Sequence, residues 1–248
     1  MKRFQGRVAF VTGGGSGLGQ ATALAFAREG AFVAVVDWKS DDAEHTVSMI
    51  EREGGKALAV TADVTQSEQI ERAVNQTVEV FGRLDVAFNN AGSGRGNGIV
   101  DTTEADWDFT HDLNLKGVWL CMKYEIPEML KTGGGAIVNT SSLTAWRHFT
   151  GNNPSYVTSK AGQLSLTRYA AVQFAAQGIR VNSVVPGIIG TPINEGMADM
   201  QKIVNKYHPM KRIGRPDEIA NAVLFLCSED ASFITGVNLP VDGGWSAT

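Results

Sequence analysis

Val11-Thr12-Gly13-Gly14-Gly15-Ser16-Gly17-Leu18-Gly19 lies between a short apolar run and a segment of helical periodicity. The run Arg7 to Val11 predicts a β-strand, and Ala21 to Gly30 predicts an α-helix that a glycine closes. The next residues, Ala31 to Val36, are all apolar, which predicts a strand buried on both faces that ends at Asp37. A strand, a glycine loop, a helix, a strand and an acid therefore follow one another at the start of the chain.

This arrangement predicts a dinucleotide-binding unit. Glycines let the backbone turn sharply and approach a pyrophosphate, which binds at the positive N-terminus of the following helix. Asp37 follows Gly19 by 18 residues, close to the offset at which an acid accepts hydrogen bonds from an adenosine ribose. Many glycine loops merely join a strand to a helix, so the flanking strands, the helix and the acid carry the prediction. The residues assigned to the dinucleotide here are Gly13, Ser16, Gly17, Leu18, Gly19, Asp37 and Trp38.

The alternation of strands and helices continues to the end of the chain. Further predicted strands span residues 57–62, 84–88, 136–139, 179–185 and 236–240. Further predicted helices span residues 41–52, 67–81, 103–130, 154–176, 198–206 and 216–227. Strands separated by helices predict an α/β fold, with a doubly wound parallel sheet of about seven strands and helices on both faces. With no repeat or linker-like stretch, we expect one domain over residues 1–248.

Composition excludes several classes of protein. A hydrophobic content of 43% with 19% charged residues is that of an ordinary globular protein, and the net charge of −4 argues against nucleic acid or membrane as a partner. No apolar run approaches the ~18 residues of a membrane span, and no signal peptide precedes the first strand, so we expect a soluble, cytoplasmic protein. Cys121 and Cys227 are predicted to be buried thiols, and the four histidines have no metal-ligand spacing, so no metal is expected.

The residues that follow the strands are expected to face the ligand, which in such a sheet lies outside the carboxyl ends of the strands. Besides the glycine loop and Asp37, these are Asp63, Asn90, Ser142 and the pair Pro186-Gly187. Tyr156 and Lys160 come directly after the Ser142 strand, four residues apart on a predicted helix, and so lie on one face one turn apart. They therefore open onto the same crevice.

A tyrosine beside a lysine is suited to proton transfer. A free tyrosine titrates near ~10, and a neighbouring ammonium favours the phenolate and lowers that pKa. Such a tyrosine passes a proton to or from an alcohol oxygen. The alternative is a half-buried Tyr156 and a solvated Lys160 that happen to lie one turn apart, and the convergence of the strand ends favours the catalytic interpretation.

Six motifs occur in order along almost the full chain: Thr12-Gly13-Gly14-Gly15-Ser16-Gly17-Leu18-Gly19, Asn89-Asn90-Ala91-Gly92, Asn114, Ser142, Tyr156 with Lys160, and Pro186-Gly187-Ile188-Ile189-Gly190-Thr191-Pro192. In this the chain resembles the classical short-chain dehydrogenase/reductase family. The resemblance implies a Rossmann-type fold and hydride transfer between a nicotinamide ring and a carbinol carbon. It also implies roles: Tyr156 as acid/base, Ser142 holding the substrate oxygen, Lys160 on the nicotinamide ribose, and Asn114 placing a proton-relay water.

The resemblance extends to the remaining site residues. Further cofactor contacts are predicted for Asp63, Val64, Asn90, Ala91, Gly92, Tyr156, Lys160, Pro186, Gly187, Ile189 and Thr191, and substrate contacts for Ser93, Leu143, Trp146, Phe149 and Met197. Some have alternatives: the Asn114 amide could bond a backbone carbonyl, Asp63 could cap the next helix, and Trp146 and Phe149 could anchor a loop. Ser142 and Tyr156 are 14 positions apart, one more than in many relatives, which leaves the identity of the substrate open.

The expected function is that of an NAD(H)-dependent oxidoreductase acting on a small secondary alcohol or ketone, cyclic ones included. Asp37 favours NAD over NADP because its carboxylate would repel a 2′-phosphate, although Lys39 lies near in sequence. The alternatives are a β-ketoacyl carrier-protein reductase and a catalytically silent nucleotide-binding regulator. Surplus apolar residues on two predicted helices, together with a second contact that the resemblance implies through the run Ile234 to Pro240, predict a homotetramer. They are Trp107, Leu113, Val118, Trp119 and Leu120 on the first and Leu164, Leu166 and Phe174 on the second.

Overall fold

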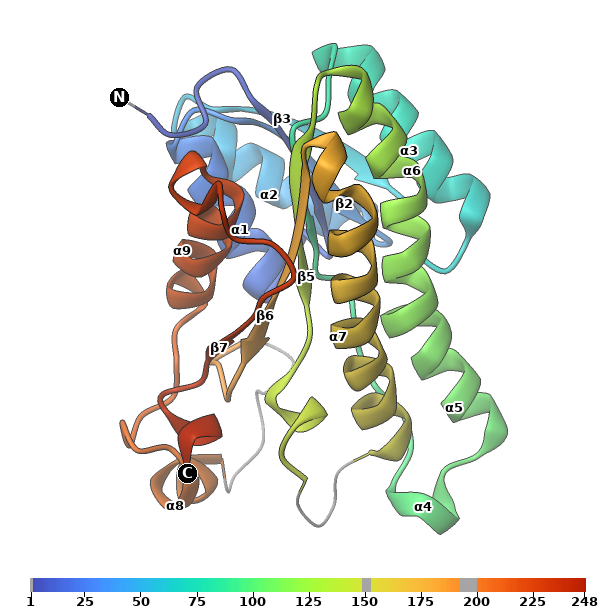
Figure 1. Cartoon of the computed structure of the whole chain (residues 1–248), viewed down its shortest axis with the longest axis vertical. Coiled ribbons are helices and arrows are strands. Elements are labelled where there is room, and N and C mark those ends of the chain that lie inside the picture. Colours follow the sequence, from blue (N-terminus) through green and yellow to red (C-terminus); the bar gives the residue numbers. More distant parts are fainter. Residues whose placement is uncertain (1, 149–152, 192–199) are drawn as a thin grey trace.

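Seven parallel strands form the centre of the computed structural model, which describes residues 2–148, 153–191 and 200–248 (Figure 1). The strands are β1 (Val8–Thr12), β2 (Phe32–Asp37), β3 (Lys56–Thr61), β4 (Val86–Asn89), β5 (Gly135–Thr140), β6 (Ile179–Pro186) and β7 (Asn238–Val241). Their order across the sheet is β3-β2-β1-β4-β5-β6-β7. The order reverses between β1 and β4, where such folds bind their ligands. The predicted doubly wound sheet is confirmed.

Helices cover both faces of this sheet (Figure 1). In the described part of the chain they are α1 (Gly17–Arg28), α2 (Ser40–Arg52), α3 (Ser67–Phe81), α4 (Gly98–Asp101), α5 (Glu104–His111), α6 (Gly117–Lys131), α7 (Pro154–Phe174), α8 (Met200–Tyr207) and α9 (Pro216–Cys227). None of these helices is both long and apolar enough to cross a membrane.

The strands divide the core into two layers because successive side chains point to opposite faces of the sheet. Ala9 and Val11 of β1 pack in the layer formed with α1, α2 and α9, whereas Val8 and Phe10 pack in the layer formed with α3, α6 and α7. Both layers are apolar, which explains the uninterrupted apolar runs of the central strands. The predicted buried thiols are confirmed, since Cys121 and Cys227 are free and buried in the two layers.

The largest differences from the predicted helices are at α1 and at the segment 103–130. Helix α1 begins at Gly17, four residues before the predicted start, because the glycine loop itself supplies the first helical turn. The single helix predicted from 103 to 130 is α5 and α6 joined by a π-helical segment, Asp112–Lys116. That wider turn contains Asn114, and π-helical turns are frequent at functional sites.

The apolar residues predicted as surplus surface divide into two groups. Val118, Leu120 and Leu164 are buried, so their part of the prediction is wrong. Leu113, Leu166 and Phe174 are partly buried and pack against the core layer of α3, α6 and α7. Trp107 on α5 and Trp119 on α6 remain exposed, at 40% and 47%.

Candidate active site

The glycine loop is folded too tightly for larger residues. Gly13 has a φ of +62°, which favours glycine, and a β-carbon there would lie 2.9 Å from Asn90 Nδ2. A β-carbon on Gly19 would collide with the Gly13 carbonyl. The backbone of this loop and the first turn of α1 are thus brought to the end of β1, and the N–H groups of the first helical turn have no partners within the helix.

Asn90 and Thr12 hold the loop against the neighbouring strand. Asn90 Nδ2 donates to the carbonyl oxygens of Thr12 and Gly13, at 3.2 and 3.4 Å. The Thr12 hydroxyl accepts hydrogen bonds from the backbone N–H groups of Asn90 and Ala91. The first two predicted motifs therefore meet at the β1–β4 switch point.

A cleft of about 770 Å³ opens beside this loop. Its lining comes from the glycine loop, from the segments at the carboxyl ends of the strands, from α5 and the residues after it, and from α7. The lining residues are Gly13, Ser16, Gly17, Leu18, Val36, Asp37, Trp38, Lys39, Asp42, Ala62, Asp63, Val64, Thr65, Asn90, Ala91, Gly92, Ser93, Arg95, Phe109, Asp112, Leu113, Thr140, Tyr156, Lys160 and Thr191. The cleft runs from Asp37 at the end of β2 to Tyr156 and Lys160 on α7. Most residues predicted to contact a dinucleotide thus share one cavity.

The Asp37 carboxylate is held in place at one end of the cleft. Its Oδ2 accepts from the Gly15 N–H at 3.0 Å and its Oδ1 from the Lys39 N–H at 3.2 Å. A carboxylate has about four acceptor positions, so two remain for ligand hydroxyls. The Lys39 side chain is paired with Asp42 at 3.7 Å and lies over the exposed Trp38 ring.

Tyr156, Ser142 and Lys160 converge at the other end. Lys160 Nζ donates to the Thr140 carbonyl at 2.7 Å and lies 5.7 Å from the centre of the Tyr156 ring. The Ser142 Oγ accepts hydrogen bonds from the Thr144 N–H and the Thr144 hydroxyl, at 3.3 and 3.0 Å, and its influence on the Tyr156 phenol lowers the pKa of that group. The neighbouring Ser141 is buried and donates to the Lys160 backbone carbonyl at 2.8 Å, which leaves Ser142 as the serine that faces the tyrosine.

The pKa of Tyr156 differs from expectation. Burial raises it above its ordinary value, and the neighbouring Ser142 hydroxyl lowers it only in part. Burial also lowers the pKa of Lys160, to about 7. The prediction that Lys160 lowers the tyrosine pKa is wrong for this structure: the ammonium is itself poorly solvated and bonds the Thr140 carbonyl, so the desolvation of the phenol dominates.

Asn114 makes the contacts of a positioning residue. Its Nδ2 donates to the Ser93 carbonyl at 2.7 Å and to Ser159 Oγ at 3.2 Å, and its Oδ1 accepts from the Ser93 N–H. A β-carbon on Gly92 would lie 2.8 Å from Asn114 Oδ1 and 3.2 Å from Lys160 Nζ. Asn114 therefore holds the loop after β4 beside Lys160. It does so through a bond from its side-chain amide to the Ser93 backbone carbonyl, which is the alternative role considered for it from the sequence.

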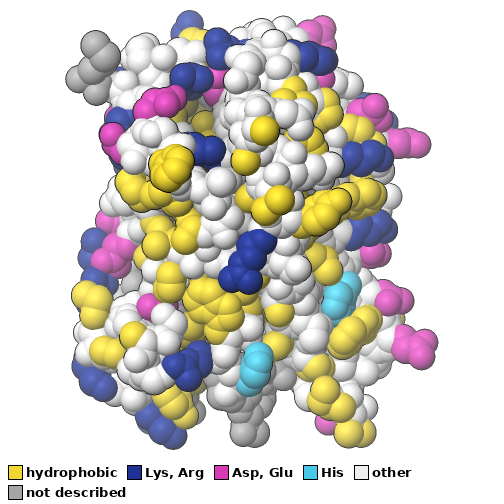
Figure 2. Space-filling view, viewed as in Figure 1, with side chains coloured by type: hydrophobic (Ala, Val, Ile, Leu, Met, Phe, Trp, Pro, Cys, Tyr) yellow, Lys and Arg dark blue, Asp and Glu magenta, His cyan; other side chains and the backbone are white. Residues whose placement is uncertain are grey.

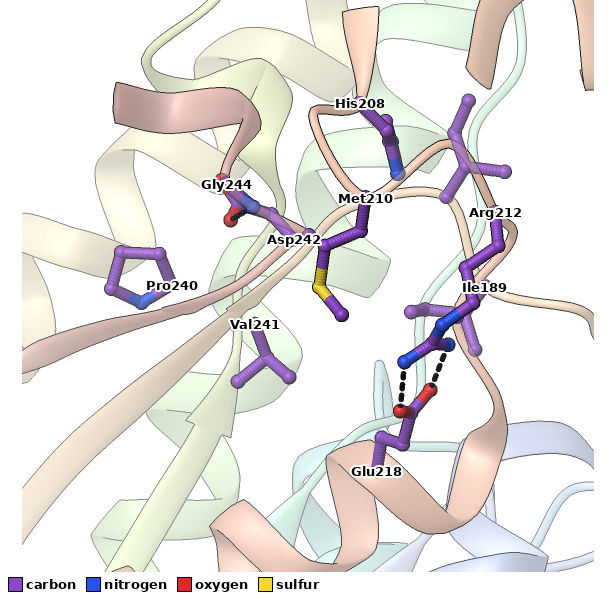
Figure 3. A pocket seen from close by; sticks show the side chains of 12 residues that line it. Ile189, His208, Met210, Arg212, Glu218, Pro240, Val241, Asp242 and Gly244 are labelled. Atoms are coloured by element: carbon purple, nitrogen blue, oxygen red, sulfur yellow. Dashed lines mark hydrogen bonds and ion pairs between the residues drawn. The ribbon is translucent and has the colours of Figure 1, made fainter. Parts of the chain in front are cut away.

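Other predicted cofactor residues lie around the cleft or outside it. Asp63 lines the cleft and its Oδ1 accepts from the Thr65 N–H, while Gln66 is the residue that precedes α3. Pro186, Gly187 and Ile189 do not line the cleft. Ile189 instead lines a separate cavity of about 290 Å³ beside Met210 and the Arg212–Glu218 ion pair (Figure 3). That cavity contains none of the predicted catalytic residues.

The predicted substrate residues have different locations. Ser93 lines the cleft, and Trp146 is partly exposed at the end of the turn after Ser142. Leu143 is buried in a small cluster with Leu164, Val185 and Trp245, so its side chain serves packing. Phe149 and Met197 lie outside the described residues.

Some cleft residues were missed by sequence reasoning. Thr140 could have been found, because it ends β5 directly before the serine pair. Arg95 could not have been found, because its position depends on a contact with another segment of the chain. Its guanidinium lies 3.6 Å from the centre of the Phe109 ring on α5. Asp42, in the first turn of α2, was also missed, whereas Lys39 was named as a neighbour of Asp37 and pairs with Asp42.

Known proteins resemble this chain over almost its full length. A family model described as enoyl-(acyl carrier protein) reductase matches residues 13–246. A crystal structure described as a short-chain dehydrogenase/reductase from Burkholderia xenovorans is 39% identical, with a TM-score of 0.95, and covers 100% of this chain and 99% of that one. The chain belongs to the short-chain dehydrogenase/reductase family.

Relatives in this family have different activities. Cyclohexanol dehydrogenase of Acinetobacter sp. (strain SE19) is 42% identical over 246 residues, which cover 99% of this chain and 97% of that protein. The 3-oxoacyl-(acyl-carrier-protein) reductase of Thermotoga maritima is 38% identical over 243 residues, which cover 98% of each chain.

Short-chain dehydrogenases/reductases use a nicotinamide cofactor, and the cleft fits one. The glycine loop leaves no room for a β-carbon and brings backbone N–H groups to the cleft, as a pyrophosphate requires. Asp37 keeps acceptor positions for a ribose. Thr140 also lines the cleft, and its backbone carbonyl is the group that binds Lys160 Nζ.

Proposed function

We propose that this chain is an NAD(H)-dependent alcohol dehydrogenase and ketone reductase acting on small secondary alcohols or ketones, cyclic ones included. The observation that carries the proposal is one cleft with Asp37 at one end and Tyr156, one turn from Lys160, at the other. The first end suits an adenosine ribose, and the second suits an alcohol oxygen.

The chemistry divides between cofactor and protein. The nicotinamide supplies or accepts the hydride. In reduction, Ser142 donates a hydrogen bond to the carbonyl oxygen and Tyr156 donates its proton as the alkoxide develops. The raised pKa keeps the phenol protonated at neutral pH, which is the form that reduction needs. In oxidation, deprotonated Tyr156 takes the proton of the alcohol; a charged Lys160 one turn away would offset part of the desolvation cost of the phenolate.

The preference for NAD over NADP rests on the charges near the end of β2. Asp37 and Asp42 both line the cleft there, and Lys39 is engaged with Asp42. A 2′-phosphate would bring ~2 negative charges towards them; unit charges ~4 Å apart at an effective dielectric of about 20 interact by roughly 4 kcal/mol. Since ~1.4 kcal/mol is tenfold, a third of that repulsion gives a tenfold preference for NAD.

Replacing Asp37 by Ser and Trp38 by Arg tests this preference. We expect wild-type enzyme to favour NAD at least tenfold in kcat/KM, and the double variant to shift towards NADP because a repulsive carboxylate is removed and a cation is added. Steady-state kinetics with both cofactors measure the effect, with Lys39→Ala as the control for the neighbouring cation. Equal efficiency in the wild type, or no shift in the double variant, would show that Asp37 does not set the preference.

A substrate panel tests the reaction class. It contains cyclohexanol, acyclic secondary alcohols, diols and sugars with NAD, and an acetoacetyl thioester with NADH and NADPH, followed by absorbance of the reduced nicotinamide. The proposal predicts turnover of small secondary alcohols, and cyclohexanol is the first choice because of the relative that carries its name. Turnover of the thioester alone would favour the carrier-protein reductase, and binding of NADH without any turnover would favour a silent regulator.

The assembly we propose is a homotetramer. Trp107, Trp119, Tyr169 and Val172 are exposed on α5, α6 and α7, which lie side by side in Figure 1, and hydrophobic side chains lie along that side in Figure 2. A second surface combines the edge strand β7 with the fully exposed Phe233. Two self-complementary patches related by two-fold axes form a D₂ tetramer.

A further inference from the structure

Glu125 is a buried carboxyl group that the proposed chemistry does not use. It lies in the middle of α6, with no exposed surface. Its Oε2 accepts a hydrogen bond from Asn89 Nδ2 at 3.0 Å. Its Oε1 is buried and has no partner among the described residues. An ionised carboxylate with one unpaired oxygen in such a place carries a large desolvation cost.

The neighbouring amides are fixed by their own hydrogen bonds. Asn89 Nδ2 also donates to Asn139 Oδ1 at 3.1 Å, and Asn139 Nδ2 donates to the Thr167 hydroxyl at 3.0 Å. The Asn89 amide therefore cannot be flipped without losing two bonds. Its Oδ1 is also buried and has no donor in the described structure. The cluster is left with two unpaired oxygens, one on Glu125 and one on Asn89. One additional proton between them would give both a hydrogen bond.

We propose that Glu125 holds that proton on Oε1 and donates it to Asn89 Oδ1, which closes a two-bond acid–amide pair that positions the cofactor cleft. One proton then satisfies both unpaired oxygens, and the carboxyl group is neutral. A fully satisfied buried pair of this kind is rigid, whereas a half-satisfied one is costly.

This pair lies directly behind the site. Asn89 and Asn139 are opposite each other at the carboxyl ends of β4 and β5. The residue after Asn89 is Asn90, which holds the glycine loop, and the residue after Asn139 is Thr140, whose carbonyl binds Lys160 Nζ. Neutral Glu125 thus fixes the Asn89 amide, and the bond from Asn89 to Asn139 joins the two strand ends that carry the cofactor loop and the lysine anchor.

Ionisation of Glu125 would break the pair. Burial raises the pKa of Glu125, the hydrogen bond from Asn89 lowers it by less, and the result is a pKa of about 8. The proton is therefore lost just above neutral pH. The groups from β4, β5 and α7 that bond within the cluster, Asn89, Asn139 and Thr167, carry no charge. On α6 itself, Cys121 is the titratable neighbour; its thiol pKa is raised well above the ordinary value, by burial and then by Glu125. Tyr124 faces α3, where its hydroxyl bonds Ser67.

Infrared spectroscopy tests the protonation without any cofactor. Wild-type enzyme labelled with carbon-13 in its glutamate carboxyl groups should show the carbonyl stretch of a protonated carboxyl group at pH 6.5, where exposed glutamates are ionised. The band should fade as the pH is raised above 8 and be absent in Glu125→Gln. Its absence from the wild type at pH 6.5, or its persistence in Glu125→Gln, would overturn the proposal. The outcome does not depend on the proposed function.

Binding of NADH tests the positioning role, which rests on the proposed function. A glutamine at 125 can donate to Asn89 Oδ1 and accept from Asn89 Nδ2, so Glu125→Gln should bind like the wild type at pH 7. Between pH 7 and 9.5 the wild-type Kd should rise at least threefold more than that of Glu125→Gln. Glu128→Gln, one turn away and paired with Lys131, is the matched control and should behave as the wild type.

Two results would contradict positioning. The first is an equal pH dependence of Kd in wild type and Glu125→Gln. The second is a Glu125→Gln protein that has lost NADH binding at pH 7 although it is folded by circular dichroism. If no variant, including the wild type, binds NADH or NADPH, the proposed function fails, while the infrared result still decides the protonation.

Discussion

Burial acts on Tyr156 and Lys160 in opposite directions. It raises the pKa of the phenol and lowers that of the ammonium to about 7, so both groups favour their neutral forms at this end of the cleft. Lys160 is therefore retained at a cost to folding, since an unfolded chain would keep its lysine charged at neutral pH. The side chain is 3% exposed, so solvent screening reduces this cost little.

Replacing Lys160 by Met should stabilise the protein at neutral pH and abolish turnover. Below its folded pKa of about 7 the buried lysine is charged at full cost, and the cost disappears as pH rises towards the ordinary value of 10.5, where both states are neutral. The stability of the wild type should thus rise from pH 7 to 10.5 relative to Lys160→Met. The bound on this change is roughly 5 kcal/mol, at ~1.4 kcal/mol per tenfold change in proton affinity.

Urea unfolding of both proteins between pH 6 and 10 measures this effect. Lys123→Met, on the exposed side of α6, provides the control and should show no such change with pH. A constant difference between wild type and Lys160→Met would mean that Lys160 is not desolvated. Loss of the bond to the Thr140 carbonyl reduces the gain at neutral pH by ~1–3 kcal/mol but does not change with pH.

The principal site residues could be predicted, whereas their pKa values could not. Asp37 ends β2, Ser142 follows β5 by two residues and Tyr156 lies in the first turn of the next long helix. The ends of parallel strands meet at one edge of the sheet. The desolvation of Tyr156 and Lys160 depends on how closely the neighbouring elements pack, which spacing along the chain does not state. Leu143 shows the same limit, because an apolar residue after a strand fits either a pocket or the core.

At the scale of elements, the start of α7 connects folding with chemistry. Asn153 Oδ1 accepts from the N–H groups of Ser155 and Tyr156, at 3.0 and 3.3 Å. The cap therefore holds the helical turn that carries the phenol. Pro154 follows at the first helical position, where its lack of an N–H costs nothing.

Asn153→Ala should destabilise the protein by ~1 kcal/mol and lower kcat/KM several-fold. The reason is that two N–H groups lose their acceptor and the Tyr156 turn frays. Thermal unfolding and steady-state kinetics measure the two effects, and Asn153→Asp, which keeps the acceptor oxygen, should restore most of both. An alanine variant with wild-type kcat/KM would show that the cap does not position Tyr156.

Elements were predictable where their pattern is local. The predicted bounds of α3 and α9 match the structure, because each has an amphipathic repeat between clear terminal residues. The strands are displaced by one or two residues, since an uninterrupted apolar run does not mark where pairing stops. The π-helical segment at Asn114 was missed because one extra residue in a turn leaves almost no trace in the periodicity.

For the whole molecule, alternation of strands and helices was sufficient to predict the sheet and its parallel order. Helix surfaces were harder to predict: Val118 and Trp119 are adjacent, yet one is buried and the other half exposed. Which of the two side chains points to the core depends on the rotation of α6 about its axis. The π-helical segment before α6 changes that rotation by its wider turn. The surface left by the fold is therefore known only from the structure.

Assembly is tested at this scale by Trp119→Glu combined with Tyr169→Glu. Charges within an apolar contact are costly, so the double variant should fall from tetramer to dimer in light scattering at micromolar concentration. Val80→Glu, an equally apolar exposed position on α3, should remain tetrameric. A wild type that is monomeric, or a double variant that stays tetrameric, would contradict the proposed contact.

Transfer of deuterium is the most direct test of the central claim, that Tyr156 serves a hydride transfer between a secondary alcohol and NAD. Cyclohexanol deuterated at its carbinol carbon is incubated with NAD and enzyme, and the NADH formed is examined by mass spectrometry. The label should appear in NADH with the wild type. Tyr156→Phe should bind NADH within a few-fold of the wild type and transfer the label ~10²–10⁴-fold more slowly, because only the phenolic proton transfer is lost. Transfer by Tyr156→Phe within about tenfold of the wild type would contradict the role given to Tyr156; formation of NADH without the label would contradict direct hydride transfer.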